Sequence, residues 1–314
     1  MTTPRESFCG AAAANDRVHL MMQVQFVDRK TRELVTESVM GDRALRFAYE
    51  TLLGRTLWPV LFGSRFVSSL LGRKYDSPKS KSAIRSLASI PGCRPDEAAK
   101  PLDDYGSFNE FFTRHLKDGA RPLGDGFVSP ADGRLMLYLN ADADMPFPLK
   151  GATRTLREVF RPSASDLRPS AALDIAVVRL APVDYHRFHF PCDCTVEGDV
   201  RVIPGKYHSV NPIALVRHPD VYADNERQIA KCRASFGDFR IVDVGAFGVG
   251  TIVQTFLGAK HAKGAEKGYF KFGGSTVLLA LPAGAVRFDA DLVDNSAKGL
   301  ETRVFCREQI GEVA

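Results

Sequence analysis

Residues 269–282, YFKFGGSTVLLALP, join two apolar segments through the tetrad Gly-Gly-Ser-Thr at 273–276. The second segment, Thr276–Leu281, is a continuous apolar run of the length and composition expected for a buried strand. A Gly-Gly-Ser-Thr sequence between two strands is most often the turn of a hairpin, because glycine tolerates positive φ. The tetrad has a second interpretation as a reactive site. A serine hydroxyl beside an unhindered glycine carbonyl can attack its own peptide bond when a base and oxyanion donors are close.

Strand patterns extend over much of the chain beyond residue 105. The segments are Arg134–Leu139, Ile175–Leu180, Thr195–Ile203, Thr251–Leu257 and Thr276–Leu281, separated by Gly, Pro and Asp turns. Few helical patterns interrupt them, which favours a mostly antiparallel sheet over a parallel α/β fold. The predicted class is therefore α+β, with an antiparallel β core and amphipathic helices in the N-terminal region.

The composition indicates a globular protein. Of 314 residues, 45% are hydrophobic and 25% are charged, which argues against wholesale disorder and against a polytopic membrane protein. The six cysteines lack paired CxxC spacing and are expected to be reduced, with Cys192 and Cys194 as small buried side chains. The chain starts without a secretory signal pattern, so a cytoplasmic start is expected.

Residues 41–74 combine leucines at helical spacing with scattered arginines, and Pro59 divides them into two predicted helices. The apolar face of such a basic pair either packs on the core or lies in a membrane interface, and the pattern alone slightly favours the core. The net charge of +5 favours anionic partners. Residues 75–105 have the Ser, Pro and charge content of a linker, which predicts an N-terminal region, 1–105, and a β-rich domain, 106–314.

Two further segments could contribute reactive side chains. SPADGR at 129–134 contains Asp132, either a turn residue or a carboxylate that orients a histidine. VDYHRFHFP at 183–191 brings together Asp184, His186, Arg187 and His189. If the tetrad is reactive, His189 is a candidate base for Ser275, and Asp132 could hold its imidazole in the required tautomer.

Several motifs occur in one order along the chain. They are SFNEFFTRHLKDGARPL (107–123), SPADGR (129–134), LAPVDYHRFHFP (180–191), IPGKYHSVNPIAL (203–215), VGTIVQT (249–255) and EKGYFKFGGSTV (266–277). With them, the sequence resembles the phosphatidylserine decarboxylases. The cleavage motif of that family is commonly Leu-Gly-Ser-Thr. Gly273 stands in place of the Leu here, which keeps the Gly–Ser bond.

The resemblance implies a proenzyme that cuts itself between Gly274 and Ser275 by serinolysis. The products would be a β subunit, residues 1–274, and an α subunit, residues 275–314, which stay associated. Ser275 would become a covalent pyruvoyl group. By position in the motifs, Asp132, His189 and Ser275 match the self-processing triad of the family, and His186 matches the histidine implicated in decarboxylation.

The implied reaction converts phosphatidylserine to phosphatidylethanolamine, with the pyruvoyl ketone as electron sink in place of pyridoxal phosphate. Headgroup contact or structural hydrogen bonding is the expected role of four polar residues: Arg187, His208, Ser209 and Asn211. A lipid substrate makes residues 41–74 an expected anchor to anionic membranes, at the cytoplasmic face of the cell membrane. No metal and no nucleic acid are expected, and the resemblance leaves room for a homo-oligomer.

Three alternatives remain open at the level of sequence. A pyruvoyl decarboxylase of a soluble amino acid would share the processing motif but not need the basic amphipathic stretch. A zinc hydrolase using Asp132, His186 and His189 as ligands would keep an intact chain with bound metal. A non-catalytic, membrane-binding β domain would also keep one chain, and would lack a reactive carbonyl.

Overall fold

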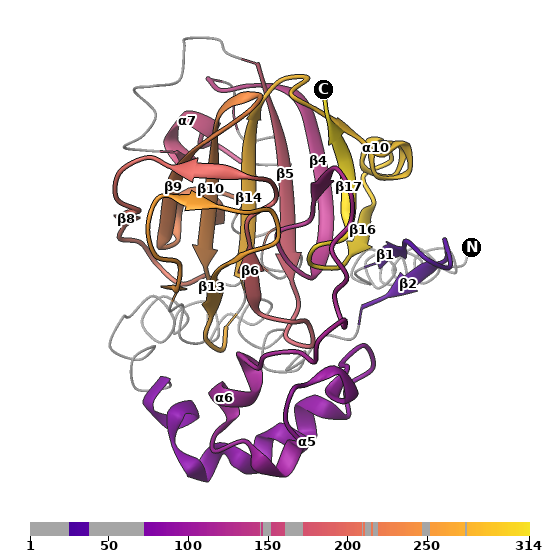
Figure 1. Ribbon diagram of the computed structural model, residues 1–314, viewed down its shortest axis with the longest axis vertical. Coiled ribbons are helices and arrows are strands. Elements are labelled where there is room, and N and C mark those ends of the chain that lie inside the picture. Colours follow the sequence, from indigo (N-terminus) through magenta and orange to yellow (C-terminus); the bar gives the residue numbers. More distant parts are fainter. Residues whose placement is uncertain are drawn as a thin grey trace, which may run out of the picture.

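The computed structural model describes residues 25–37, 72–144, 146, 152–160, 172–208, 210, 215, 219–246, 252–273 and 275–314. One large sheet forms the body of the protein (Figure 1). In spatial order its strands are β12 (Lys260–His261), β7 (Cys194–Val196), β9 (Arg227–Ala234), β10 (Gly237–Gly245), β14 (Ser275–Pro282), β5 (Ala172–Leu180), β4 (Gly133–Asp142), β16 (Glu301–Val304), β1 (Gln25–Asp28) and β2 (Leu34–Thr36), and β8 (Arg201–Ile203) also pairs with β9. Of these pairs only β1–β16 is parallel, which confirms the predicted, mostly antiparallel α+β fold.

In the described part of the chain, two smaller antiparallel sheets and the short helices α7 (Leu156–Val159), α9 (Val221–Asp224) and α10 (Ala290–Ala297) complete the β-rich part. One sheet has the order β11 (Ile252–Gln254), β13 (Glu266–Phe270) and β6 (Arg187–His189), and the other β15 (Val286–Phe288), β17 (Gln309–Val313) and β3 (Phe127–Val128). Strands β6 and β13 position the sequence candidates, because β6 contains His189 and follows His186, and β13 leads to the tetrad.

Strand β14 is buried on both faces. Its odd-numbered residues, such as Val277 and Leu279, belong to one hydrophobic cluster, and its even-numbered residues, such as Leu278 and Ala280, belong to another. Because side chains alternate along a strand, an uninterrupted apolar run lets β14 contribute to two cores at once. The strand predicted at Thr276–Leu281 is confirmed as the central strand between β10 and β5.

The tetrad is not a hairpin turn. Strand β13 pairs with β11 and β6, whereas β14 pairs with β10 and β5 in the other sheet. Both edges of β13 are therefore occupied, and the chain after Phe270 has to cross to the large sheet, where it enters as β14 at Ser275. The prediction of a simple hairpin is wrong for this reason.

Two of the other predicted strands are shorter than expected. The segment Thr195–Ile203 contains β7 and β8, which are separated at Gly198, where φ is 69°. Glycine reaches this left-handed conformation without a steric penalty, so the chain can turn there. The segment Thr251–Leu257 keeps only β11. The strands predicted at 134–139 and 175–180 lie within β4 and β5.

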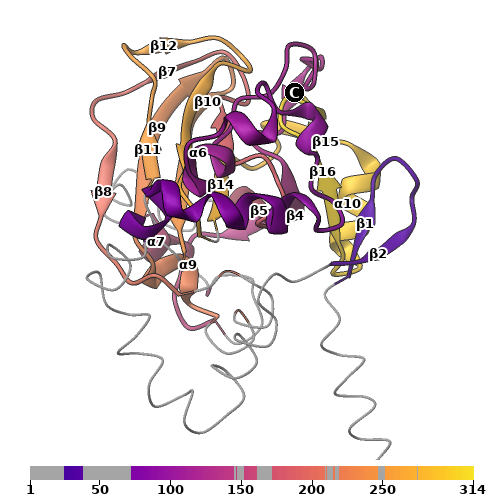
Figure 2. The same cartoon turned by 90° about the horizontal axis from the view of Figure 1, so that it is seen from below.

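Residues 78–112 form a helical layer at the lower end of the large sheet in Figure 1. The layer contains η1 (Pro78–Lys81), α5 (Ser82–Ala88), η2 (Pro95–Glu97), η3 (Leu102–Asp104) and α6 (Phe108–Phe112). In Figure 2, which views the molecule from below, the purple ribbons of the helical layer lie in front of the ends of β14, β5 and β4. Residues 75–105, expected to be a linker, bury Ile84, Leu87 and Tyr105 in a hydrophobic cluster shared with α6. They are thus an ordered part of the fold.

Several sequence predictions fall outside the described residues. They concern Ser209, Asn211, Gly274 and nearly all of the amphipathic stretch 41–74, of which only residues 72–74 are described. Among the described helices, none combines the length and apolar character that a membrane crossing requires. The domain boundary at 105/106 stays a prediction. Cys192 and Cys194 are buried, as expected.

Shortening one buried side chain of β14 tests the central place of this strand in the core. Leu279→Ala removes a fully buried side chain, so we expect it to reduce the free energy of unfolding by about 3 kcal/mol. The matched control is Leu257→Ala, because Leu257 is 91% exposed and its loss should change stability by less than about 0.5 kcal/mol. Urea unfolding followed by circular dichroism measures both. Equal midpoints for the two variants would contradict this account of the core.

Candidate active site at the start of strand β14

Ser275 occupies the first position of β14, where it pairs with Gly245 of β10 and Leu180 of β5. The residue is fully buried, and within the described part of the chain its hydroxyl has no hydrogen-bond partner. A buried polar group without a partner loses its hydration and gains nothing in return, at a cost of about 1–3 kcal/mol. Such groups are uncommon in folded proteins and call for a functional explanation. Ser275 is therefore the first candidate for chemistry.

The segment that leads to Ser275 is held by the helical layer. The N–H of Phe272 donates to the Asn109 side-chain oxygen at 3.0 Å. The Phe272 ring packs edge-on against Phe108 and Phe112, with ring centroids 4.9 and 5.2 Å apart. Asn109 and both phenylalanines come from α6, which begins with Ser107 as its N-cap, the Ser107 hydroxyl accepting from the Glu110 N–H. Helix α6 thus fixes the approach of the chain to Ser275.

His186 precedes β6 and is fully buried. Its Nδ1 lies 3.0 Å from the carbonyl oxygen of Asp184, which can only accept, so Nδ1 carries the proton in this hydrogen bond. The other ring nitrogen, Nε2, is buried without a hydrogen-bond partner among the described residues. Burial lowers the pKa of His186 to about 4, against an opposing effect of Asp184. At neutral pH the ring is therefore a neutral imidazole with Nε2 free to accept a proton.

Two sets of contacts bring His186 to the end of β13 from which the chain proceeds to Ser275. The N–H of Phe270, the last residue of β13, donates to the His186 carbonyl at 2.9 Å. The Phe112 ring lies 3.9 Å from the His186 ring and also contacts Phe272, which is three positions before Ser275. The Phe112 ring therefore connects the His186 imidazole to the segment that precedes Ser275.

Asp184 orients His186 and is itself an ionised, buried carboxylate. Burial alone would raise the pKa of Asp184, but the Arg134 guanidinium and the Ala181 N–H lower it below the ordinary value. Arg134 Nη1 pairs with Asp184 Oδ2, and the Ala181 N–H donates to the same oxygen at 2.6 Å. Ala181 follows Leu180, the β5 partner of Ser275. The turn that carries His186 is thus tied to the strand beside Ser275.

His189 lies at the other end of β6. It stands opposite Glu266, the first residue of β13, whereas His186 contacts the last. Its Nδ1 is 3.0 Å from the Gly264 carbonyl, and its Nε2 is 3.4 Å from the Tyr185 hydroxyl. Burial lowers the pKa of His189. Neither of its ring nitrogens is hydrogen-bonded to Asp132 or Ser275, so the Gly264 carbonyl rather than Asp132 contacts Nδ1.

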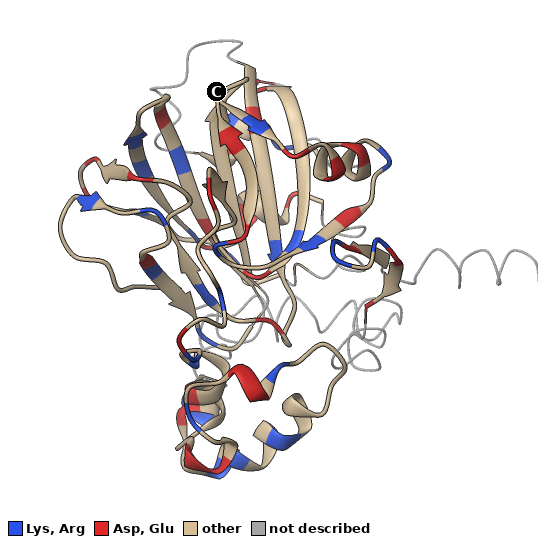
Figure 3. Ribbon diagram, turned by 45° about the vertical axis from the view of Figure 1, so that its right-hand side comes forward, with Lys and Arg blue, Asp and Glu red and all other residues tan. Residues whose placement is uncertain are grey.

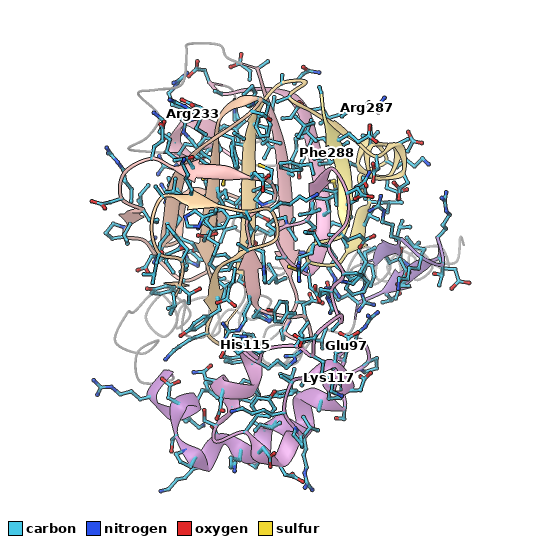
Figure 4. The ribbon with its side chains drawn as sticks, in the orientation of Figure 1. Glu97, His115, Lys117, Arg233, Arg287 and Phe288 are labelled. Atoms are coloured by element: carbon cyan, nitrogen blue, oxygen red, sulfur yellow. The ribbon has the colours of Figure 1, made fainter. Side chains whose placement is uncertain are left out.

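Asp132 is buried just before β4 and is held by three donors. Arg121 donates to its two oxygens at 2.9 and 2.6 Å, and the Cys306 N–H donates at 2.8 Å. Arg121 also pairs with Glu97 at 2.8 Å. Figure 4 shows Glu97 with His115 and Lys117 where the helical layer meets the sheet. The Asp132 carboxylate therefore joins the helical layer to the start of β4.

The two remaining candidates that the structure describes, Arg187 and His208, have partners within the protein. Arg187 donates to both Glu266 carboxylate oxygens, at 2.8 and 3.0 Å, and to the Thr113 carbonyl. The main chain of His208 exchanges hydrogen bonds with the Asn225 side chain, which also donates to the Gly245 carbonyl at 2.8 Å. Structural bonding, one of the two expected roles, is thus present at both residues.

Sequence reasoning missed three residues of this site: Asn109, Arg134 and Asn225. All three are buried polar side chains that fix main chain or carboxylates around Ser275 and His186. Asn109 and Arg134 lie inside the motifs SFNEFFTRHLKDGARPL and SPADGR, which was the available signal. Asn225 lies in none of the motifs.

A metal centre finds no support in the described part of the chain. There, no three or more His, Cys, Asp or Glu side chains are arranged to hold a metal ion. Both Nδ1 atoms of His186 and His189 face backbone carbonyls. The zinc ligand set considered from the sequence, Asp132 with the two histidines, is accordingly not assembled.

Comparisons with known proteins agree with the family resemblance of the sequence motifs. The sequence model of the phosphatidylserine decarboxylase family matches residues 108–312. A phosphatidylserine decarboxylase proenzyme of Fusobacterium nucleatum is 38% identical over 294 residues, covering 92% of this chain and 97% of the relative. Proenzymes of the same name from Ruminiclostridium cellulolyticum and Chlamydia caviae are 38% and 36% identical, with 92% and 93% of this chain covered and 97% and 98% of the relatives.

The low pKa of His186 predicts a pH dependence of stability. Between the ordinary value of 6.5 and about 4, the unfolded chain takes up a proton at this residue and the folded chain does not. Falling pH should therefore destabilise the fold through His186, by up to about 3 kcal/mol. Urea unfolding at pH values across this window, for the wild type and His186→Gln, measures the effect. The variant should lose less stability than the wild type, and equal losses would contradict a buried neutral imidazole.

Proposed function

We propose that this chain, which belongs to the phosphatidylserine decarboxylase family, is a self-processing decarboxylase that converts phosphatidylserine to phosphatidylethanolamine. The observation that carries the proposal is that Ser275 Oγ and His186 Nε2 are both buried without a hydrogen-bond partner among the described residues, and that Phe112 packs on His186 and on Phe272 in the segment before Ser275. One is a nucleophile and the other a neutral base. The word proenzyme in the names of the relatives supports maturation by cleavage.

The proposed cleavage uses the serine at the entrance to β14. Ser275 Oγ attacks the Gly274 carbonyl carbon while its proton passes to an imidazole, and collapse breaks the peptide C–N bond to leave an ester. Loss of the Ser275 α-proton expels the Gly274 carboxylate and leaves dehydroalanine. Water then replaces the nitrogen, which departs as ammonia, and the new amino terminus is a pyruvoyl group.

The residues around Ser275 fit such a group. Ser275 and its strand neighbours are buried, so bulk water is excluded from the position that the group would occupy. A pyruvoyl ketone supplies an electron sink for the carbanion left when the serine headgroup loses carbon dioxide. His186 would hold a proton at Nε2 and deliver it to the α-carbon of the product. The Asp184 carbonyl keeps Nδ1 as the donor throughout and thereby orients the ring.

Two assignments of the processing base are in competition. The family resemblance assigns the transfer of the Ser275 proton to His189, with His186 serving decarboxylation. The contacts favour His186 for both steps, because His186 shares Phe112 with the segment before Ser275. In this second assignment His189, which contacts Tyr185, supports the segment around His186.

The strand pairing supports lasting association of the two proposed subunits. After cleavage, β14 would belong to the α subunit, while its neighbours β5 and β10 would belong to the β subunit. Strand β16 would likewise remain between β4 and β1. Each pairing crosses the subunit boundary, so separation would require the large sheet to come apart.

A lipid substrate supports association with a membrane surface. We infer a peripheral position at the cytoplasmic face, with the amphipathic stretch 41–74 as the anchor. The helical layer exposes Lys79, Lys81 and Arg85, which suit anionic headgroups, although Arg85 is already paired with Asp103. Charged residues of both signs occur over the layer (Figure 3), so we expect the stretch 41–74 to contribute most of the apolar anchoring.

Ser275→Ala tests the proposed function most simply. Without the hydroxyl, we expect a single uncut chain and loss of phosphatidylserine decarboxylation in vesicles, because neither the ester nor the ketone can form. The matched control is Ser296→Ala, which removes a hydroxyl from α10 and should leave two fragments and full activity. Gel electrophoresis and release of carbon dioxide are the measurements. Decarboxylation by an uncut Ser275→Ala chain would disprove the pyruvoyl assignment.

The paired variants His186→Gln and His189→Gln separate the two assignments of the base. If His186 accepts the Ser275 proton, His186→Gln should slow self-cleavage by about 100-fold or more, as expected for loss of a general base, and His189→Gln should slow it much less. Densitometry of cleavage during cell-free synthesis gives both rates. The reverse order would return the processing role to His189.

A further inference from the structure

A chain of buried ion pairs joins the N-terminal hairpin to the candidate active site. Glu37 follows β2, and its side chain is only 4% exposed. Its Oε1 lies 3.0 Å from Arg134 Nε in an ion pair without hydrogen-bond geometry, and its Oε2 accepts a hydrogen bond from Arg179 Nη2 at 2.9 Å. The two arginines come from the adjacent strands β4 and β5, where they are paired in register. One carboxylate therefore joins two strands of the large sheet.

Arg134 is the link from Glu37 to the site. Its Nη1 pairs with Asp184 Oδ2, and its guanidinium lies 4.7 Å from the centre of the Phe26 ring in β1. Both arginine side chains are 3% exposed and that of Asp184 is 4% exposed. Arg134 is thus held between Glu37 and Asp184, with an aromatic ring contacting its guanidinium. In this position the guanidinium has little freedom to choose another rotamer.

Asp184 transmits this constraint to the imidazole through its own backbone. Its side chain accepts from the Ala181 N–H at 2.6 Å, and its carbonyl accepts from His186 Nδ1 at 3.0 Å. The two contacts define the turn from Ala181 to His186. A shift of the Asp184 carboxylate would move the carbonyl that selects the tautomer of His186.

We propose that Glu37 is a positioning residue for His186, acting through Arg134 and Asp184. The effect of Glu37 on the rate of self-cleavage rests on the proposed function. Its effect on the tautomer of His186 does not. Without the Glu37 charge, Arg134 keeps Asp184 as its single anionic partner. The buried positive charge of Arg134 is then only partly compensated. Asp184 would then lose its fixed geometry, and His186 Nδ1 its fixed acceptor. Small displacements of a catalytic base produce large losses in rate.

Glu301 provides a matched control in the same network. It pairs with Arg179 through two contacts, at 2.9 and 2.5 Å, and contacts neither Arg134 nor Asp184 in the described structure. Glu301→Gln therefore removes a carboxylate from the same buried cluster without touching the proposed route to His186. A purely structural role of the cluster predicts similar consequences for the loss of either glutamate.

The experiment compares the full-length wild type with Glu37→Gln, Glu37→Asp and Glu301→Gln. Self-cleavage during cell-free synthesis should be slowed about tenfold or more in Glu37→Gln. It should be partly restored in Glu37→Asp, which keeps the charge, and unchanged in Glu301→Gln. Urea midpoints report how much stability each variant loses. Equal slowing in Glu37→Gln and Glu301→Gln, or wild-type cleavage in Glu37→Gln, would overturn the proposal.

A second measurement does not depend on cleavage. In an uncut Ser275→Ala background, nitrogen NMR of labelled histidine should show His186 as one tautomer with the proton on Nδ1. Adding Glu37→Gln should give a mixture of tautomers, and adding Glu301→Gln should not. A single unchanged tautomer with Glu37→Gln would overturn the proposal. If Glu37→Gln does not fold, Glu37→Asp takes its place: cleavage and tautomer identical to those of Glu301→Gln would then refute the positioning role.

A wild-type chain that does not cleave would count against the proposed function alone. The tautomer comparison would still decide the role of Glu37, because it needs only the folded, uncut protein.

Discussion

The rest of the structure depends on the double constraint on strand β14, which is paired with β10 and β5 at its edges and buried on both faces. This constraint places Ser275 at a fixed position where the chain leaves one sheet and enters another. Because β13 pairs elsewhere, residues 271–273, which are the described part of the connection, carry no ladder hydrogen bonds to β14. A peptide bond in such a connection can be cut while the strand beyond it keeps its neighbours, which is what a self-processing site requires.

The chemistry proposed at this point depends on burial as much as on the reacting groups. His186 stays neutral because burial disfavours its charged form, and Asp184 stays ionised because Arg134 and the Ala181 N–H overcome the same effect. Two titratable groups two positions apart are thus held in different states by their partners. The hydrogen bond from Nδ1 to a backbone carbonyl, rather than to a carboxylate, keeps the imidazole a modest base with one defined accepting nitrogen.

Local pattern was enough to predict β4, β5 and β14, because alternation and apolar runs directly reflect burial, whereas β9 and β10, which also contribute to the core, were not predicted. The motifs also identified Asp132, His186, His189 and Ser275 as candidates. The arrangement of these residues could not be predicted, since it depends on pairings between distant segments. The partner of His189 Nδ1 is Gly264, 75 positions away, and nothing local indicates that carbonyl. The crossing at the tetrad likewise follows from the occupied edges of β13, which no local pattern reveals.

The most direct test of the central claim, that Ser275 becomes a ketone at a new chain end, is intact mass spectrometry of the purified active protein. The account predicts two polypeptides, residues 1–274 and a fragment beginning at position 275. The second should be lighter, by one molecule of ammonia, than a fragment with amino-terminal serine, and borohydride should increase its mass by two hydrogens. A single active polypeptide with the mass of the full chain and an unmodified serine would contradict it.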